Sequence, residues 1–180
     1  TGEQTRRFVH IGVGIFVIFS PLFFKSALQP ALLALIFILL NAVTLKAGQM
    51  KGMHTTERRS YGTVFFPLTF LILIAMYWYS DPVILMLGMM VMTLADPLAS
   101  IVGMKVKKPR QFTFWKDPKS VQGSLVVFIT TFIIITAFLP LFRWLDGTPI
   151  PNWQSLIVMA ISVGVVATLA EAISSAGSDN

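Results

Sequence analysis

The sequence predicts an all-α integral membrane protein, a polytopic bundle of about six transmembrane helices forming one domain over residues 1–180. The first observation behind this is composition: of the 180 residues, 55% are hydrophobic and only 12% are charged. Soluble domains carry about 25% charged residues. The second observation is a mean hydropathy of +0.76. The third is that the charges gather in short segments between apolar runs.

Six apolar runs come close to the roughly 20 residues that a helix needs to cross a bilayer. The first follows Arg6 and Arg7 and could instead be the apolar part of a signal peptide. The five runs that follow it, and His10 on its first turn, favour a retained helix. The six runs are Phe8–Phe24, Leu28–Leu45, Val64–Tyr79, Val83–Val102, Leu125–Phe142 and Leu156–Ala170.

The distribution of Lys and Arg predicts the orientation. If all six runs cross the membrane, twelve of the 14 basic residues fall on one side, and only Lys25 and Arg143 fall on the other. Basic residues are enriched in short cytoplasmic loops. We therefore expect a cytoplasmic N-terminus, with residues 46–63, residues 103–124 and the C-terminal tail at the same face.

Several chemistries are excluded by composition. The chain has no cysteine and two histidines, which argues against disulfides and a zinc site. No Walker-type loop or Rossmann glycine fingerprint occurs. The net charge of +6 comes from loops between apolar runs rather than from one polar face. Nucleic acid is therefore not the expected partner.

Asp96 is the most informative residue of the fourth run. A carboxylate at membrane depth costs about 3 kcal/mol and usually has a function. On a helix, Asp96, Ser100, Gly103 and Lys107 would share one face. The alternative is that Asp96 and Pro97 form the N-cap and first position of a fresh helix.

A second polar element precedes the fifth run. Asp117 and Pro118 have the pattern of an N-cap followed by a first helical position, so we expect the fifth helix to begin there. Its free N–H groups, Lys119 and the Ser120 hydroxyl would then form a phosphate site. Gly123 would keep the first turn open. An ordinary capped helix with interfacial lysines is the alternative.

Three further polar clusters are predicted at the cytoplasmic face. One lies at the start of the first run, one before the third run, and one at the end of the sixth. Interfacial arginines and a surface ion pair are the simpler explanations of the first two. The residues are Arg6, Arg7 and His10; Glu57 and Arg58; and Glu171 with Asp179.

These motifs, in this order, resemble those of the CTP-dependent polyprenol kinase family, which includes dolichol, phytol and farnesol kinases and a yeast-type diacylglycerol kinase. The bacterial phytol-kinase-like members are the most similar group. The resemblance rests on Arg6-Arg7-Phe8-Val9-His10, Glu57-Arg58-x-x-Tyr61-Gly62, Asp96-x-x-Ala99-x-x-x-Gly103, Lys119-Ser120-x-x-Gly123-Ser124, and Glu171 with Asp179-Asn180.

The resemblance implies an enzyme that transfers the γ-phosphate of CTP to the hydroxyl of a membrane isoprenoid alcohol or diacylglycerol. It would work with Mg²⁺ at the cytoplasmic side of a bacterial inner membrane. Asp96, with Asp179 or Glu171, would hold the metal, and either Asp96 or Glu171 would accept the alcohol proton. Lys119 would act on the transferring phosphate. The nucleotide would contact Lys119, Ser120, Gly123, Ser124, Gly103, Lys105, Lys107, Arg6, Arg7, His10, Glu57 and Arg58.

The sequence departs from the family pattern at three points. Residues 104–107 lack a second glycine common in the family, and Gln122 stands where Glu is common. Family members also continue past Asn180, so we expect a chain shortened at its C-terminus.

The competing hypotheses are a phosphatidate cytidylyltransferase-like enzyme making a CDP-lipid, and a small lipid transporter. The concentration of polar chemistry at one face argues against transport.

Overall fold

The computed structural model describes residues 2–46, 62–106, 109–113 and 118–174, with residues 2–7 and 104 described by their backbone only. Helices make up almost all of these residues, which confirms the predicted all-α membrane fold. The exception is a two-stranded antiparallel hairpin, which pairs Gln111 with Ser120 and Phe112 with Lys119.

The chain divides into two compact units, the first up to Met89 and the second from Met90. The prediction of a single domain stays a prediction. The first unit contains α1 (Gly2–Ile18), α2 (Ser20–Phe23), α3 (Leu28–Lys46), α4 (Gly62–Tyr77) and the beginning of α5 (Pro82–Lys105). The second contains the rest of α5, then β1 (Gln111–Phe112), β2 (Lys119–Ser120), α6 (Val121–Ile133), the π-helix η1 (Ile134–Phe138), α7 (Leu139–Asp146) and α8 (Trp153–Ile173).

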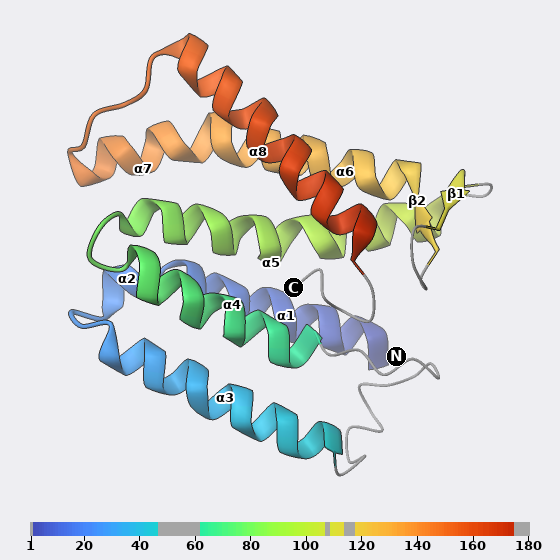
Figure 1. Ribbon diagram of the computed structural model, residues 1–180, viewed down its shortest axis with the longest axis horizontal. Coiled ribbons are helices and arrows are strands. Elements are labelled where there is room, and N and C mark those ends of the chain that lie inside the picture. The colour runs from blue at the N-terminus through green and yellow to red at the C-terminus, as the bar shows by residue number, and fades with distance from the viewer. Residues whose placement is uncertain (1, 47–61, 107–108, 114–117, 175–180) are drawn as a thin grey trace. The chain divides into compact units, whose positions relative to one another are not determined.

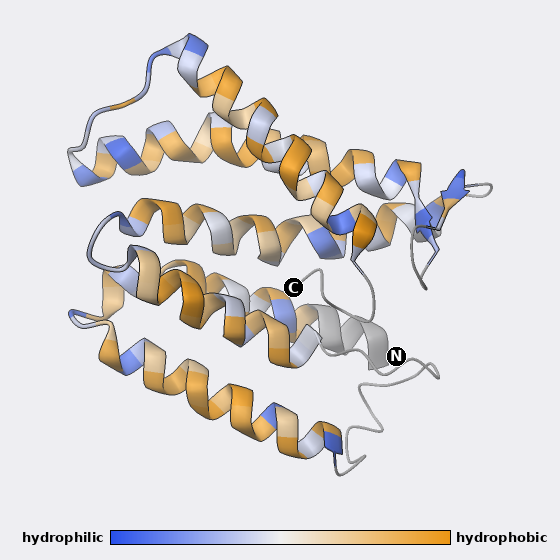
Figure 2. Cartoon of the chain, in the orientation of Figure 1, coloured by the Kyte–Doolittle hydropathy of each residue, from blue (hydrophilic) through white to orange (hydrophobic). Residues whose placement is uncertain are grey.

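Among the described residues, four helical segments are long and apolar enough to cross a membrane. They are Leu28–Lys46, Pro82–Gly103, Val121–Asp146 and Trp153–Ile173. Figure 2 shows hydrophobic residues along these helices and hydrophilic ones in the β1–β2 hairpin. The remaining two predicted runs form shorter apolar helices, Phe8–Ile18 and Gly62–Tyr77. The chain is therefore an integral membrane protein, while the count of six crossings and the side of the N-terminus stay predictions.

In the first unit, a side chain of α3 repairs a gap in the hydrogen bonding of α4. Pro67 lies inside α4 and has no N–H, so it cannot donate to the carbonyl of Thr63 four residues earlier. The Asn41 side chain of α3 donates to that carbonyl instead, at 2.8 Å. A neighbouring helix thus supplies the donor that a membrane helix needs around a proline. This contact ties the end of α3 to the start of α4.

In the second unit, α6, η1 and α7 form one continuous segment that passes through Pro140 (Figure 1). Pro140 cannot donate to the carbonyl of Thr136, and a straight α-helix would place its ring against that carbonyl. The wider turn of η1, immediately before Pro140, gives the ring room. The predicted fifth run is therefore one continuous helical segment.

Helix α8 returns along α6 through a face of small residues (Figure 1). Ala160 and Gly164 are buried on this face. A Cβ at Gly164 would lie 3.0 Å from two ring carbons of Phe128 on α6, so only glycine permits this approach. Nearer the hairpin, Ala99 of α5 and Val127 of α6 share a buried cluster against which Ala167 packs. Small residues are how membrane helices reach close contact.

The start of the fifth helix differs from the prediction, and the alternative offered for Asp96 and Pro97 is not found. The fifth helix begins at Val121, and Ser120, not Asp117, is its N-cap. Pro118 is not helical, because the chain next enters β2 and pairs with β1. Asp96 and Pro97 do not start a fresh helix either, since α5 runs through Pro97 without ending.

Candidate functional site

The first turn of α6 is capped and held in place from two directions. The Ser120 hydroxyl accepts a hydrogen bond from the N–H of Gly123 at 3.1 Å, in the usual geometry of an N-cap. The N–H of Val121 donates to the carbonyl of Arg110 at 2.9 Å. The N–H of Arg110 donates to the Gln122 side chain at 3.2 Å. Arg110 therefore lies directly beside the positive end of the α6 dipole.

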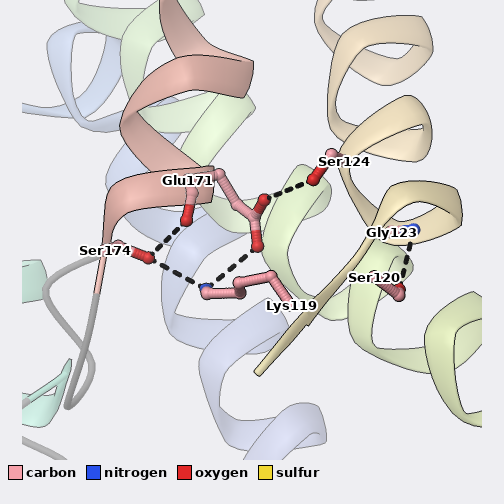
Figure 3. A network of polar contacts seen from close by, with 6 residues as sticks. All are labelled: Lys119, Ser120, Gly123, Ser124, Glu171 and Ser174. Atoms are coloured by element: carbon pink, nitrogen blue, oxygen red, sulfur yellow. Dashed lines mark hydrogen bonds and ion pairs between the residues drawn. The ribbon is translucent and has the colours of Figure 1, made fainter. Parts of the chain in front are cut away.

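Lys119, immediately before the cap, reaches to the end of α8 (Figure 3). Its ammonium lies 2.9 Å from Oε1 of Glu171 and donates to the Ser174 hydroxyl at 2.9 Å. The other carboxylate oxygen, Oε2, accepts from the Ser124 hydroxyl at 3.0 Å. The Ser174 hydroxyl donates in turn to the Glu171 carbonyl at 2.7 Å. We call Lys119, Ser124, Glu171 and Ser174 the α6–α8 network.

Electrostatics explain why a lysine is needed at this position. Glu171 stands in the last turn of α8, where the helix dipole is negative and disfavours a carboxylate. The ammonium of Lys119 compensates both the carboxylate and the helix end. The two side chains are only 15% and 14% exposed. Removing either partner would leave the other charge poorly solvated, a larger cost than that of an exposed pair.

Helix α5 packs against the first turn of α6 at two glycines, Gly103 of α5 and Gly123 of α6. A Cβ added at Gly103 would lie 3.2 Å from the Ser120 hydroxyl oxygen, and one at Gly123 would lie 3.0 Å from it. The Cβ at Gly123 would also come within 3.5 Å of the Ala99 carbonyl. Both glycines therefore permit the close approach of α5 to the cap. Asp96 lies one turn before Ala99 on α5 and is half-buried.

The described residues show no preformed metal site. They contain no group of three or more His, Cys, Asp or Glu side chains placed to hold an ion. The oxygens of Glu171 face Lys119 and Ser124, so this carboxylate is a poor ligand in the arrangement described. Mg²⁺ is often held by one or two carboxylates together with substrate phosphates. A role of Asp96 in holding Mg²⁺ stays a prediction, and Asp179 lies outside the described residues.

The other predicted site residues are placed less fully. Lys105 is exposed at the last residue of α5. The backbone of residues 6 and 7 is helical in α1. In the first unit, the His10 ring packs edge-on against Phe66, with centroids 4.8 Å apart. A role of His10 in nucleotide binding stays a prediction. Lys107, Glu57 and Arg58 lie outside the described residues.

The sequence analysis missed three residues that shape this region. Ser174 joins the network, and its position three residues after Glu171, at the end of an apolar run, was a signal of a C-terminal cap. Gln122 accepts a bond from the Arg110 backbone, which a glutamate could also do. Arg110 lies between the fourth and fifth apolar runs, and nothing in the local sequence shows that its backbone bonds to the first turn of the next helix.

Comparison with known proteins found two similar curated sequences. A phytol kinase of Synechocystis sp. is 26% identical over 138 residues, which cover 76% of this chain and 59% of that protein. A probable chloroplastic phytol kinase of Triticum aestivum is 26% identical over 186 aligned residues, 94% of this chain and 59% of that protein. The chain thus spans about three-fifths of the length of these relatives. No family model matches the chain, and no solved structure matches it.

Proposed function

Taking this chain as a phytol-kinase-like relative of the polyprenol kinases, the resemblance that the two curated sequences confirm, we propose that it is a lipid kinase. It transfers the γ-phosphate of CTP to the hydroxyl of a membrane isoprenoid alcohol of the phytol or polyprenol type, or to diacylglycerol. The reaction depends on Mg²⁺ and takes place at the cytoplasmic face of a bacterial inner membrane. The observation that carries the proposal is the similarity to two phytol kinases over most of the chain.

The chemistry of the second unit suits this reaction. Phosphoryl transfer needs little covalent help from a protein, but it needs positioning and neutralisation of negative charge. The first turn of α6 combines the positive end of a helix dipole with the ammonium of Lys119 and with Arg110 held alongside it. Phosphates are commonly bound by such helix N-termini. Lys119 and Ser120 would hold the β- and γ-phosphates, with Lys105 assisting.

Asp96 is the carboxylate that would hold Mg²⁺, together with phosphate oxygens of the nucleotide. The metal, when bound, would neutralise charge on the phosphates. The protein supplies the fixed position of this carboxylate on α5, close in sequence to Ala99 and Gly103, which contact the α6 cap. The alcohol proton goes to a carboxylate, either Asp96 or Glu171.

The membrane helices explain how the lipid alcohol reaches the enzyme. A phytol-type alcohol is apolar except for its hydroxyl, so it remains in the bilayer and reaches the enzyme from the side. Its hydroxyl then lies at the interface, at the depth where the apolar helices end and the polar hairpin begins (Figure 2). This arrangement brings a water-soluble nucleotide and a lipid alcohol to one surface.

The test uses CTP labelled at the γ- or the α-phosphate, with phytol, farnesol, undecaprenol and diacylglycerol in detergent or proteoliposomes. We expect γ-label in a lipid phosphate and no α-label in lipid. Transfer of α-label into a CDP-lipid would instead show a cytidylyltransferase. ATP in place of CTP, and EDTA in place of Mg²⁺, test the nucleotide and the metal.

Two substitutions test the site itself. Asp96→Asn keeps the size of the side chain and removes its charge, and we expect phosphate transfer to fall about 1,000-fold or more because metal binding is lost. Lys119→Ala removes the ammonium. If both variants fold and phosphorylate the alcohol at the rate of the unmodified protein, the site has been placed wrongly.

A further inference from the structure

We propose that Glu171 is a positioning residue that holds the Lys119 ammonium for the nucleotide, and that it is not the catalytic base. This inference rests on the proposed function, since it assumes that Lys119 binds phosphate. The observation behind it is the α6–α8 network, in which both carboxylate oxygens of Glu171 already have partners (Figure 3).

The contacts of Glu171 fix its carboxylate in one orientation. Oε1 lies 2.9 Å from the Lys119 ammonium, and Oε2 accepts from the buried Ser124 at 3.0 Å. A general base must turn an oxygen toward the proton that it takes. A metal ligand must face a cation, and the ammonium at Oε1 would repel one. Either role would require Glu171 to leave Lys119, whereas positioning uses the contacts as they stand.

The Ser174 hydroxyl acts as both donor and acceptor in the α6–α8 network. Its hydroxyl proton goes to the Glu171 carbonyl at 2.7 Å, so its oxygen is left to accept from Lys119 at 2.9 Å. The ammonium is thus held by two acceptors from the last turn of α8, and donors and acceptors alternate without conflict. Lysine has a long, flexible side chain that loses conformational freedom when it binds a ligand. Holding it beforehand lowers the entropic cost of binding phosphate.

The location of the network points to nucleotide binding rather than to support of the bilayer helices alone. Lys119 directly precedes Ser120, the N-cap of the turn proposed to bind phosphate. Ser124, which orients the carboxylate, belongs to the same first turns of α6. The close packing of α8 on α6 at Gly164 already joins the two helices without any charge. The Lys119–Glu171 ion pair is therefore not needed to join α6 and α8.

The test is Glu171→Gln in the full chain, with Asp146→Asn as the matched carboxylate-to-amide control, because Asp146 is exposed at the end of α7. Glutamine keeps the shape and the hydrogen-bonding capacity but not the charge. We expect the KM for CTP and the dissociation constant of CTP to rise about 10- to 100-fold, the range for a weakened bond to a charged group. We expect the acidic limb of the pH profile of kcat to remain.

A double variant supplies the second readout. If Glu171 acts through Lys119, then Glu171→Gln adds little to Lys119→Ala, and the two effects are not additive. Ser124→Ala, a milder change, should shift the KM for CTP in the same direction by a smaller factor and provides a second test if Glu171→Gln does not fold. The unfolding midpoint in detergent is measured for every variant.

Two results would overturn the proposal. A fall in kcat of about 100- to 10,000-fold with loss of the acidic limb would make Glu171 the base. A lower unfolding midpoint with unchanged CTP binding would make the network purely structural. Equilibrium binding of CTP distinguishes failure of this proposal from failure of the proposed function. A protein that binds CTP but phosphorylates no alcohol refutes the lipid kinase. The CTP affinities of the variants would still decide the role of Glu171. Failure of the unmodified protein to bind CTP refutes both.

Discussion

Within the described residues, each unit has a polar contact between separate elements, and the two contacts differ in what the backbone requires of them. In the first unit, the neutral side chain of Asn41 donates to the Thr63 carbonyl because Pro67 cannot. In the second, Lys119 and Glu171 form a charged contact between β2 and α8. No missing backbone donor calls for that charged pair.

The difference separates a structural contact from a candidate functional one. A carbonyl inside a membrane helix must find a donor, so the Asn41 contact is fully explained by helix stability. A charge pair near the bilayer is costly to desolvate and is weak evidence for stability. The position of the Lys119–Glu171 pair beside the α6 N-terminus fits the proposed ligand that carries phosphate.

Within the α6–α8 network, substitution of Lys119 should have the largest effect on activity. Lys119→Ala removes the ammonium proposed to contact the transferring phosphate, and we expect phosphate transfer from CTP to fall about 100- to 1,000-fold, as when a donor to developing charge is lost. Lys119→Arg should recover part of the activity because it keeps the charge. Equal activity of the alanine and arginine variants would contradict a role for this charge.

Substitution of Arg110 should have a smaller effect that depends on salt. Arg110 is held beside the first turn of α6 by its backbone, but its side chain is exposed. We expect Arg110→Ala to raise the KM for CTP roughly 3- to 10-fold at low ionic strength, and less at high ionic strength, because exposed charges are screened. Arg143→Ala at the end of α7 is the control. A KM for CTP that does not change at any salt concentration would remove Arg110 from the site.

A methyl group at Gly123 should affect activity more than stability. Its Cβ would lie 3.0 Å from the Ser120 hydroxyl, so the cap must shift, at a cost of about 1 kcal/mol. Alanine regains about 1 kcal/mol in helix propensity. We expect Gly123→Ala to leave the unfolding midpoint nearly unchanged while the KM for CTP rises several-fold, about the effect of a moved phosphate donor. Gly12→Ala, where the Cβ meets nothing within 4 Å, is the matched control.

Loss of the Asn41 contact should have the smallest effect on activity and a clear effect on stability. Asn41→Leu leaves the Thr63 carbonyl without its donor, and we expect the free energy of unfolding to fall by about 1–3 kcal/mol. In a Pro67→Ala background, the new N–H can serve the same carbonyl, so Asn41→Leu should cost less. An equal cost in both backgrounds would show that Asn41 does something other than replace the proline N–H.

The sequence predicted the features that depend on local composition. Hydropathy predicted the membrane helices because each apolar run is defined by its own residues, and Gly123 and Ser120 were recognised as parts of one helix start. The start of α6 was misplaced because Asp117 and Pro118 imitate a cap. The pairing of Lys119 with Phe112, which keeps residue 119 extended, is a contact between distant residues.

The contacts among the residues of the α6–α8 network could not be predicted from the sequence, because they also join distant residues. Glu171 was noted as a carboxylate at the end of an apolar run, but its contact with Lys119 depends on how closely α8 approaches α6. That approach is set by the shape of Gly164 against Phe128 rather than by charge. Motif order predicted the candidate residues, and packing determines which of them meet.

The most direct test measures γ-phosphate transfer from CTP to phytol alongside the unfolding midpoint for Lys119→Ala and Asn41→Leu. We expect different patterns: Lys119→Ala loses transfer per folded molecule in addition to some stability, while Asn41→Leu loses stability but keeps transfer per folded molecule. If Lys119→Ala also keeps transfer per folded molecule, the charged network has no role in the reaction beyond holding the fold.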